Sequence, residues 1–353
     1  MKTFNLSFIL IFIFSINTYA QKEMKDYESS YYVTFSGTHP GQVIHKGNNW
    51  DILVALKRGK TLKELKDLGI PFSQKQIEVL CALNFLEKDD ETYRSLITIL
   101  NKQQTIEIRD FTKDIAVKIA PLIHDDYMQL FETLKEKGFE DNTYTVLFSY
   151  IMDNIVWQML EINNILPKKS TSVEKPIWDG TIWFYYPKRN FQCGTNSQNV
   201  DGLVFASNWS EISELSFTNL DKETILEEII KSSKVTDNVL KETLIKYDIC
   251  DNDGNLKIPY IKNDSTLNLN RYSINIAKNI YDYLTNSIDF TEISRKYNIK
   301  SKGVAIIIVY HEIMWDILDT LEEKGILKKP EAFLNPSSAK ISDLKDLLLI
   351  YEE

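Results

Sequence analysis

His311 and Glu312 form a His-Glu pair inside an apolar segment, a combination that could serve a zinc hydrolase. In an HExxH helix, two histidines one turn apart bind zinc and the glutamate acts as the general base. Here Trp315 occupies the position of the second histidine, and the other three histidines lie far earlier in the chain. We therefore predict no metal site here and interpret His311 and Glu312 as a partly buried structural polar contact.

A second group with chemical potential is the aromatic segment from Trp178 to Tyr186, which includes Trp183 and Tyr185 and is followed at a short hairpin's length by Trp209. Flat rings on a sheet face can stack on a sugar or hold an extended peptide. Because rings fall on both faces of such a strand, we expect at least one to be exposed. Trp178, Trp183, Tyr185 and Trp209 are thus candidate ligand- or partner-binding residues, the alternative being a strand whose rings fill the core.

The remaining reactive types give weaker patterns. The three cysteines are widely spaced, and Cys193, in a Gly/Asn-rich stretch, is the best candidate for a reactive thiol. The segment CDNDGN at 250–255 resembles part of a calcium loop, but Ile249 and Tyr260 stand where the first and last oxygen ligands belong. We predict no metal and no cofactor. A hydrolase-type enzyme with a site between two halves of the chain, using His311, Glu312 or Cys193, remains an alternative.

Composition and the N-terminus bear on location and partners. The chain has 353 residues and a net charge of −9, which disfavours non-specific binding to nucleic acid or anionic membranes. Residues 1–20 combine Lys2, a short apolar run and small residues up to Ala20, the pattern of a signal peptide. We expect cleavage after Ala20, a periplasmic or secreted soluble protein, and no stable membrane insertion afterwards. The abundance of Lys, Asn and Ile suggests a bacterial source.

The sequence segments that are expected to position these residues occur twice in the chain, as an internal repeat. Val146–Leu160 (VLFSYIMDNIVWQML) and Val304–Leu318 (VAIIIVYHEIMWDIL) align with apolar residues at nearly every position, and Thr61–Asp90 aligns with Thr224–Asp253. Such self-similarity indicates an internal duplication. After the signal peptide we divide the chain into residues 21–170 and 171–353. The linker is Lys-, Ser- and Pro-rich, and a C-terminal helix is expected over residues 341–351.

Each copy reads as a helix, a short turn, a second helix and a two-stranded ribbon, over residues 50–103 and 222–264. Ser73 and Thr236 stand where the second helix needs an N-cap. This order resembles the winged helix-turn-helix superfamily. The resemblance implies a second helix that reads DNA. However, Ser73–Glu78 offers one Lys against one Glu, and Thr236–Glu242 one Lys against two acidic residues, too little positive charge for a DNA groove.

The expected fold is therefore α+β and helix-rich. It contains two tandem copies of a winged-helix-like unit, each with extra helices and a small antiparallel ribbon. The expected function is a non-enzymatic binding or interaction protein of the cell envelope with a protein or glycan partner. A winged-helix nucleic-acid-binding protein is the less favoured alternative.

Overall fold

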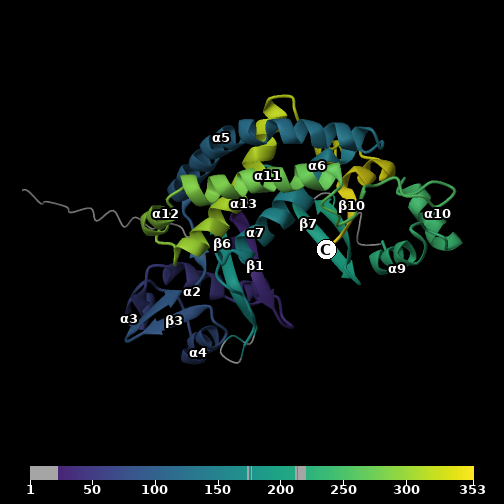
Figure 1. Cartoon of the computed structure of the whole chain (residues 1–353). Helices are drawn as coiled ribbons and strands as arrows, with labels where there is room; N and C mark the ends of the chain where they lie inside the picture. The colour runs from purple at the N-terminus through teal and green to yellow at the C-terminus, as the bar shows by residue number, and fades with distance from the viewer. Residues whose placement is uncertain (1–22, 173–174, 176, 211–212, 214–219) are drawn as a thin grey trace, which may run out of the picture.

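The computed structural model describes residues 23–172, 175, 177–210, 213 and 220–353, so the expected signal peptide lies outside the described residues. The protein is α+β and helix-rich, as expected. Three long helices form its central layer: α5 (Lys102–Lys135), α11 (Asn268–Ser287) and α13 (Lys302–Glu323). Helices α11 and α13 both pack along α5 (Figure 1). None of the described helices is long and apolar enough to cross a membrane.

One end of this layer carries a unit of short elements built from the first part of the chain (Figure 1). Its helices and strands are α1 (Pro40–His45), α2 (Asn49–Ala55), β2 (Lys60–Thr61), α3 (Leu62–Asp67), α4 (Gln74–Ala82), β3 (Leu86–Asp89) and β4 (Thr92–Ser95), with β2, β4 and β3 in one antiparallel sheet. The N-cap expected at Ser73 is present, because its Oγ accepts a hydrogen bond from the backbone N–H of Gln76 at 3.1 Å.

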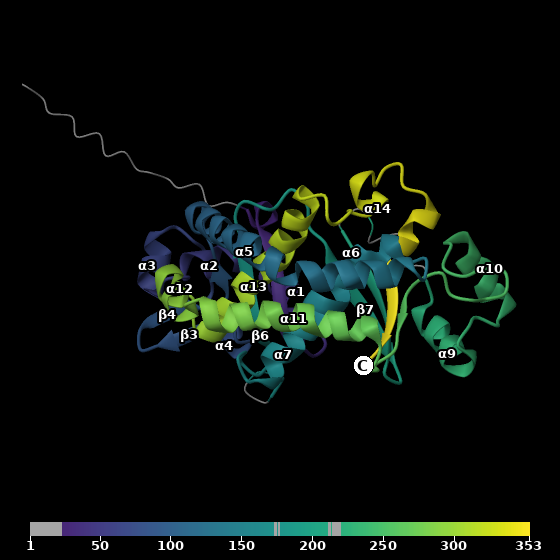
Figure 2. The same cartoon turned by 45° about the horizontal axis from the view of Figure 1, so that its top comes forward.

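The opposite end carries α9 (Lys222–Ser232) and α10 (Asn238–Lys246) (Figure 2). Here the cap of α10 is Asp237 rather than Thr236, whose hydroxyl instead donates to Glu228. The strand pair expected after this helix pair is reduced to an isolated bridge between Cys250 and Leu256. The strand that follows, β9 (Tyr260–Ile261), pairs with a different sheet. A further short helix, α12 (Phe290–Tyr297), precedes α13.

The C-terminal segment differs from expectation. Residues 341–347 form the 3-10 helix η4 (Ile341–Leu347), and the next five form strand β10 (Leu348–Glu352), so the helix expected over 341–351 is wrong. Strand β10 lies between β8 (Leu203–Trp209) and β9, and β7 (Gly194–Val200) completes this sheet. A continuous apolar run suits a central strand buried on both faces, which periodicity alone does not distinguish from a buried helix.

Strand β6 (Trp178–Tyr185) ties the two parts of the chain together. It pairs antiparallel with β1 (Glu28–Phe35) and parallel with β5 (Thr98–Ile99). Its Trp178, Ile182 and Phe184 side chains enter the core of the N-terminal unit, while Trp183 and Tyr185 enter the larger core under α5, α11 and α13. The two hydrophobic cores therefore do not correspond to the division of the chain at residue 170, because β6 contributes side chains to both cores.

The remaining described elements are short and connect the layers. They are η1 (Met24–Asp26), η2 (Glu140–Asn142), α6 (Thr143–Thr145), the π-helix η3 (Val146–Val156), α7 (Trp157–Ile162) and α14 (Glu331–Leu334). The π-helix η3 packs against α11 and α13 and also contacts β7 and β8. Because π-helical turns are rare and concentrate at functional sites, η3 is a natural place to look for one.

Candidate functional site: a tryptophan-lined cavity

A cavity of about 410 Å³ lies where β1, β6, the start of β7, η3 and α13 meet. Four tryptophans line it: Trp157, Trp183, Trp209 and Trp315. Each comes from a different element, namely α7, β6, β8 and α13. Its size and its mainly aromatic walls with a few polar groups are typical of small-molecule binding sites.

The sequence-predicted aromatic residues separate into two pairs. Trp183 and Trp209 line the cavity. Trp178 and Tyr185 do not, because the indole Nε1 of Trp178 donates to the Leu83 carbonyl at 3.0 Å and the Tyr185 hydroxyl to the Ile308 carbonyl at 3.0 Å. The expectation of a solvent-exposed ring in this strand is wrong for the rings of β6, since a core covers each of its faces.

Two buried polar atoms in the cavity wall have no hydrogen-bond partner among the described residues, Nε1 of Trp183 and Nδ1 of His311. The two rings meet edge to face with centroids 5.0 Å apart, and His311 makes a similar contact with Trp315 at 4.6 Å. Burial lowers the pKa of His311 to about 4, so the imidazole is neutral at pH 7. Buried polar atoms in proteins are nearly always paired, so these two are exceptions, and in this structure both atoms are closed off from solvent.

Asp153 supplies a third polar group at the cavity, from the π-helix η3. Its Oδ1 accepts a hydrogen bond from Nε1 of Trp157 at 3.1 Å, and burial raises its pKa to about 6. In the two similar sequence segments Asp153 aligns with His311 and Trp157 with Trp315. Sequence reasoning noted this alignment but not its consequence, that both aligned pairs face one cavity.

Cys193 also lines the cavity, but its thiol is not activated. The side chain is buried, its Sγ lies 3.5 Å from the Tyr144 hydroxyl, and burial raises the pKa of the thiol to about 12. A thiol with such a pKa stays protonated and is a poor nucleophile. Cys193, the best candidate for a reactive thiol in the sequence, is thus buried and protonated, and its backbone carbonyl accepts a hydrogen bond from Nε1 of Trp315 at 3.1 Å.

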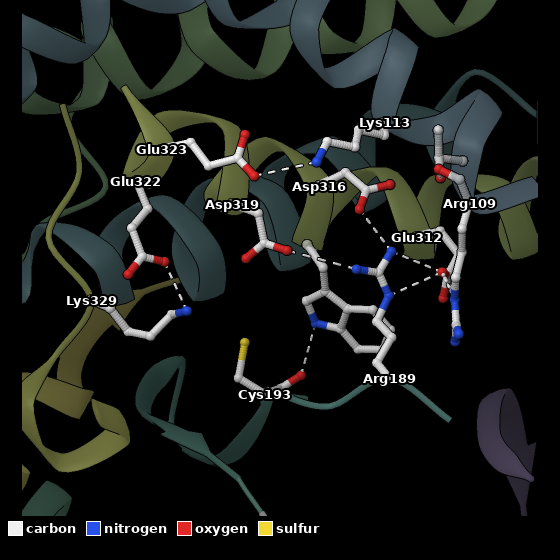
Figure 3. Close-up of polar contacts among 12 residues, drawn as sticks. Arg109, Lys113, Arg189, Cys193, Glu312, Asp316, Asp319, Glu322, Glu323 and Lys329 are labelled. Carbon is white, nitrogen blue, oxygen red and sulfur yellow. Dashed lines mark hydrogen bonds and ion pairs between the residues drawn. The ribbon is translucent and has the colours of Figure 1, made fainter. Parts of the chain in front are cut away.

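Glu312 belongs to a buried ion cluster beside the cavity (Figure 3). One of its oxygens, Oε2, accepts hydrogen bonds from Nε of Arg109 at 2.9 Å and from Nε and Nη2 of Arg189 at 3.1 and 2.9 Å. Arg109 also donates to Glu28 at 2.7 Å, and Arg189 to Asp316 at 2.8 Å. The sequence interpretation of Glu312 as a structural polar contact agrees with this geometry, whereas its two arginine partners were not foreseen.

The cluster contains more carboxylates than guanidinium groups. Burial and the nearby charge of Glu312 raise the pKa of Glu28, and burial likewise raises the pKa of Asp316. Arg189 also lies over the Trp315 ring, with its guanidinium carbon 5.2 Å from the centroid. Because Trp315 lines the cavity, the contact of Arg189 with its ring means that the ion cluster supports this part of the cavity wall.

No known protein family, curated protein or solved structure matches this chain. The described residues contain no group of three or more His, Cys, Asp or Glu side chains placed to hold a metal ion. The site must therefore be interpreted from its own geometry.

Proposed function

We propose that the protein is an exported, non-enzymatic binding protein of the cell envelope that holds a sugar in the tryptophan-lined cavity. The observation that carries the proposal is the pair of unpartnered polar atoms, Nε1 of Trp183 and Nδ1 of His311, in a wall that combines indole and other aromatic rings with polar side chains. An empty polar pair of this kind is costly unless a ligand or water completes it.

The chemistry of the walls favours a neutral, polyhydroxylated ligand. Indole faces offer flat apolar surfaces for the C–H face of a sugar ring, and the indole N–H donates to a hydroxyl oxygen. Neutral His311 can accept from or donate to a hydroxyl group. Asp153 adds an acceptor when ionised and a donor when protonated. A strongly charged ligand would find little complementary charge among these groups.

An enzyme at the same cavity is less well supported. Its candidate nucleophile, the Cys193 thiol, has a raised pKa, and one oxygen of its candidate base, Glu312, already accepts from two arginines. A buried, protonated thiol is a poor nucleophile, and the contacts with the two arginines tie Glu312 into the ion cluster. We further propose that the signal peptide directs export and that the winged-helix-like regions, if they are copies of one unit, serve protein contacts.

The test uses residues 21–353 and a panel of neutral mono- and disaccharides, measured by calorimetry and by tryptophan fluorescence. Trp183→Phe removes the unpartnered N–H and part of the stacking surface, and should weaken binding about tenfold, or ~1.4 kcal/mol. Trp178→Phe is the matched control, because it alters an equally buried tryptophan of the same strand that faces the other core. Absence of saccharide binding, or equal losses in both variants, would refute the proposal.

A further inference from the structure

A second cleft, of about 630 Å³, lies at the junction of the N-terminal unit and α12, well separated in sequence from the tryptophan residues. Five basic side chains line it, and Glu87 is its only acidic lining residue; the basic ones are Lys57, Arg58, Arg94, Lys296 and Lys300. The chain as a whole has a net charge of −9, so the charge of this cleft is opposite in sign to that of the protein. The potential in this cleft therefore favours anions.

Most of this positive charge is not neutralised within the protein. Lys296 pairs with Glu107 at 2.9 Å, and Arg94 donates only to the neutral Asn298 side chain, at 2.9 Å. Within the part of the chain that the structure describes, Lys57, Arg58 and Lys300 form no side-chain ion pair or hydrogen bond. Lys57 is half-buried and the other four basic residues are exposed, so the unfavourable term is repulsion among like charges, which a counter-charge from outside would relieve.

The fold holds these groups in place from three separate segments. Lys57 and Arg58 follow helix α2, Arg94 lies on β4, and Lys300 lies in the turn between α12 and α13. The contact between Arg94 and Asn298 joins the segments directly, and Figure 2 shows α12 beside β4. Asn298 ends α12 in the left-handed conformation, with φ of 56°, and so turns the chain toward the cleft lining at Lys300.

Lys57 shows the effect of the missing counter-charge. Its side chain is half-buried, and burial together with the neighbouring Arg58 charge lowers its pKa. An anion bound beside it would reverse that effect, because an opposite charge within a few ångströms favours the ammonium form. The pKa of Lys57 is thus a reporter of occupancy that does not depend on any assay of biological activity.

We propose that this cleft is a binding site for a small molecule that carries a phosphate group. Two arginines can each offer a planar pair of N–H donors to phosphate oxygens, and the lysines add point charges around them. A nucleic acid would need a longer stripe of positive charge than one cleft. Helix α4 stands where a winged-helix unit would have its DNA-recognition helix, and Lys75 is the one basic residue of this helix. This inference is independent of the proposed sugar site.

The experiment titrates the chain of residues 21–353 with inorganic pyrophosphate and, separately, with glucose 6-phosphate, using calorimetry at low and moderate salt. Arg58→Gln alters an exposed residue and should leave folding intact while weakening pyrophosphate binding at least tenfold. Lys57→Met should weaken it similarly, and the Lys57 ammonium should show a raised pKa in the pyrophosphate complex by NMR. Lys63→Gln is the control of equal charge change, since Lys63 is exposed and pairs with Asp67 on α3.

Each outcome decides the proposal. Loss of affinity in Arg58→Gln but not in Lys63→Gln supports it, and tighter binding of glucose 6-phosphate than of pyrophosphate would assign the ligand to organic phosphates. Millimolar pyrophosphate without heat or an NMR shift at Lys57 would overturn it. So would equal weakening in all three variants, which would show an unspecific effect of net charge. Much tighter binding of single-stranded RNA than of either phosphate would replace the small-molecule site by a nucleic-acid site.

Discussion

Arg189 is the residue whose replacement tests the buried ion cluster most directly. Its side chain is 12% exposed and contacts two carboxylates that are more deeply buried, Glu312 at 0% and Asp316 at 8%. Arg189→Met keeps an unbranched side chain of related length but removes the charge and the three hydrogen bonds that the guanidinium donates to Glu312 and Asp316. Glu312 then retains Arg109 alone, and among the described residues the basic partner of Asp316 is lost.

The expected cost follows from leaving a buried carboxylate without its counter-charge. Removing one partner of a buried ion pair typically destabilises a protein by about 3–5 kcal/mol. We expect Arg189→Met to lower the free energy of unfolding by this amount, measured by urea denaturation with circular dichroism. Lys113→Met is the matched control, because Lys113 of α5 likewise pairs with a carboxylate of α13, Glu323, but both side chains are more than half exposed, at 59% and 63%. An exposed pair contributes at most about 1 kcal/mol.

A compensated variant separates lost charge balance from lost packing. Arg189→Met combined with Glu312→Gln and Asp316→Asn leaves Arg109 paired with Glu28, and the carboxylate on α13 that loses Arg189 is then the half-exposed Asp319. Since neutral replacements of buried ion pairs are often tolerated, this triple variant should recover part of the stability lost in the single one. The reasoning is refuted if Arg189→Met costs no more than Lys113→Met, or if the triple variant is less stable than Arg189→Met alone.

Three further predictions concern the cavity wall. Folding raises the pKa of Asp153 from 3.8 to about 6, so its contribution to stability is greatest when it is protonated and falls as pH rises between these values. In pH-dependent urea denaturation, Asp153→Asn should therefore gain stability relative to the wild type over that range. A difference that stays constant with pH would contradict the pKa shift. The Cys193 thiol should resist alkylation in the folded protein and react only in denaturant, whereas labelling at a rate similar to that of a model thiol would show that it is accessible. In Gly194→Ala, the added Cβ would lie 2.7 Å from Cζ2 of Trp209, so the indole must move and the tryptophan fluorescence should change. An unchanged fluorescence spectrum and an unchanged affinity for saccharide would show that the cavity wall is not packed this closely.

Local patterns in the sequence were sufficient for many of the elements. The helix cap at Ser73 and the helix pair of the first unit follow from capping and periodicity, which depend on neighbouring residues only. The α+β, helix-rich class was also predictable. The tandem duplication and the winged-helix resemblance stay predictions.

Only the tertiary structure decided which face of each element is covered. The sequence shows that the rings of β6 fall on both faces of the strand, but not that a core covers both faces, so that Trp178 and Tyr185 are packed away while Trp183 borders a cavity. The apolar run 347–351 suits a helix or a buried strand equally, and the pairing of residues 348–352 with β8 selects the strand. Neighbours across a sheet set both outcomes, and local propensity carries no information about them.

For the candidate sites too, the sequence indicates some features and only the tertiary structure shows the others. The sequence alone indicated that a His-Glu pair and a group of tryptophans were unusual, because their residue types and local surroundings are unusual. It did not indicate that Arg109 and Arg189 meet Glu312 across long chain separations, or that basic residues near 57 and 300 share a cleft in an acidic chain. Such contacts form only when the whole chain has folded, since the free energy that brings them together comes from burying the surrounding apolar surface.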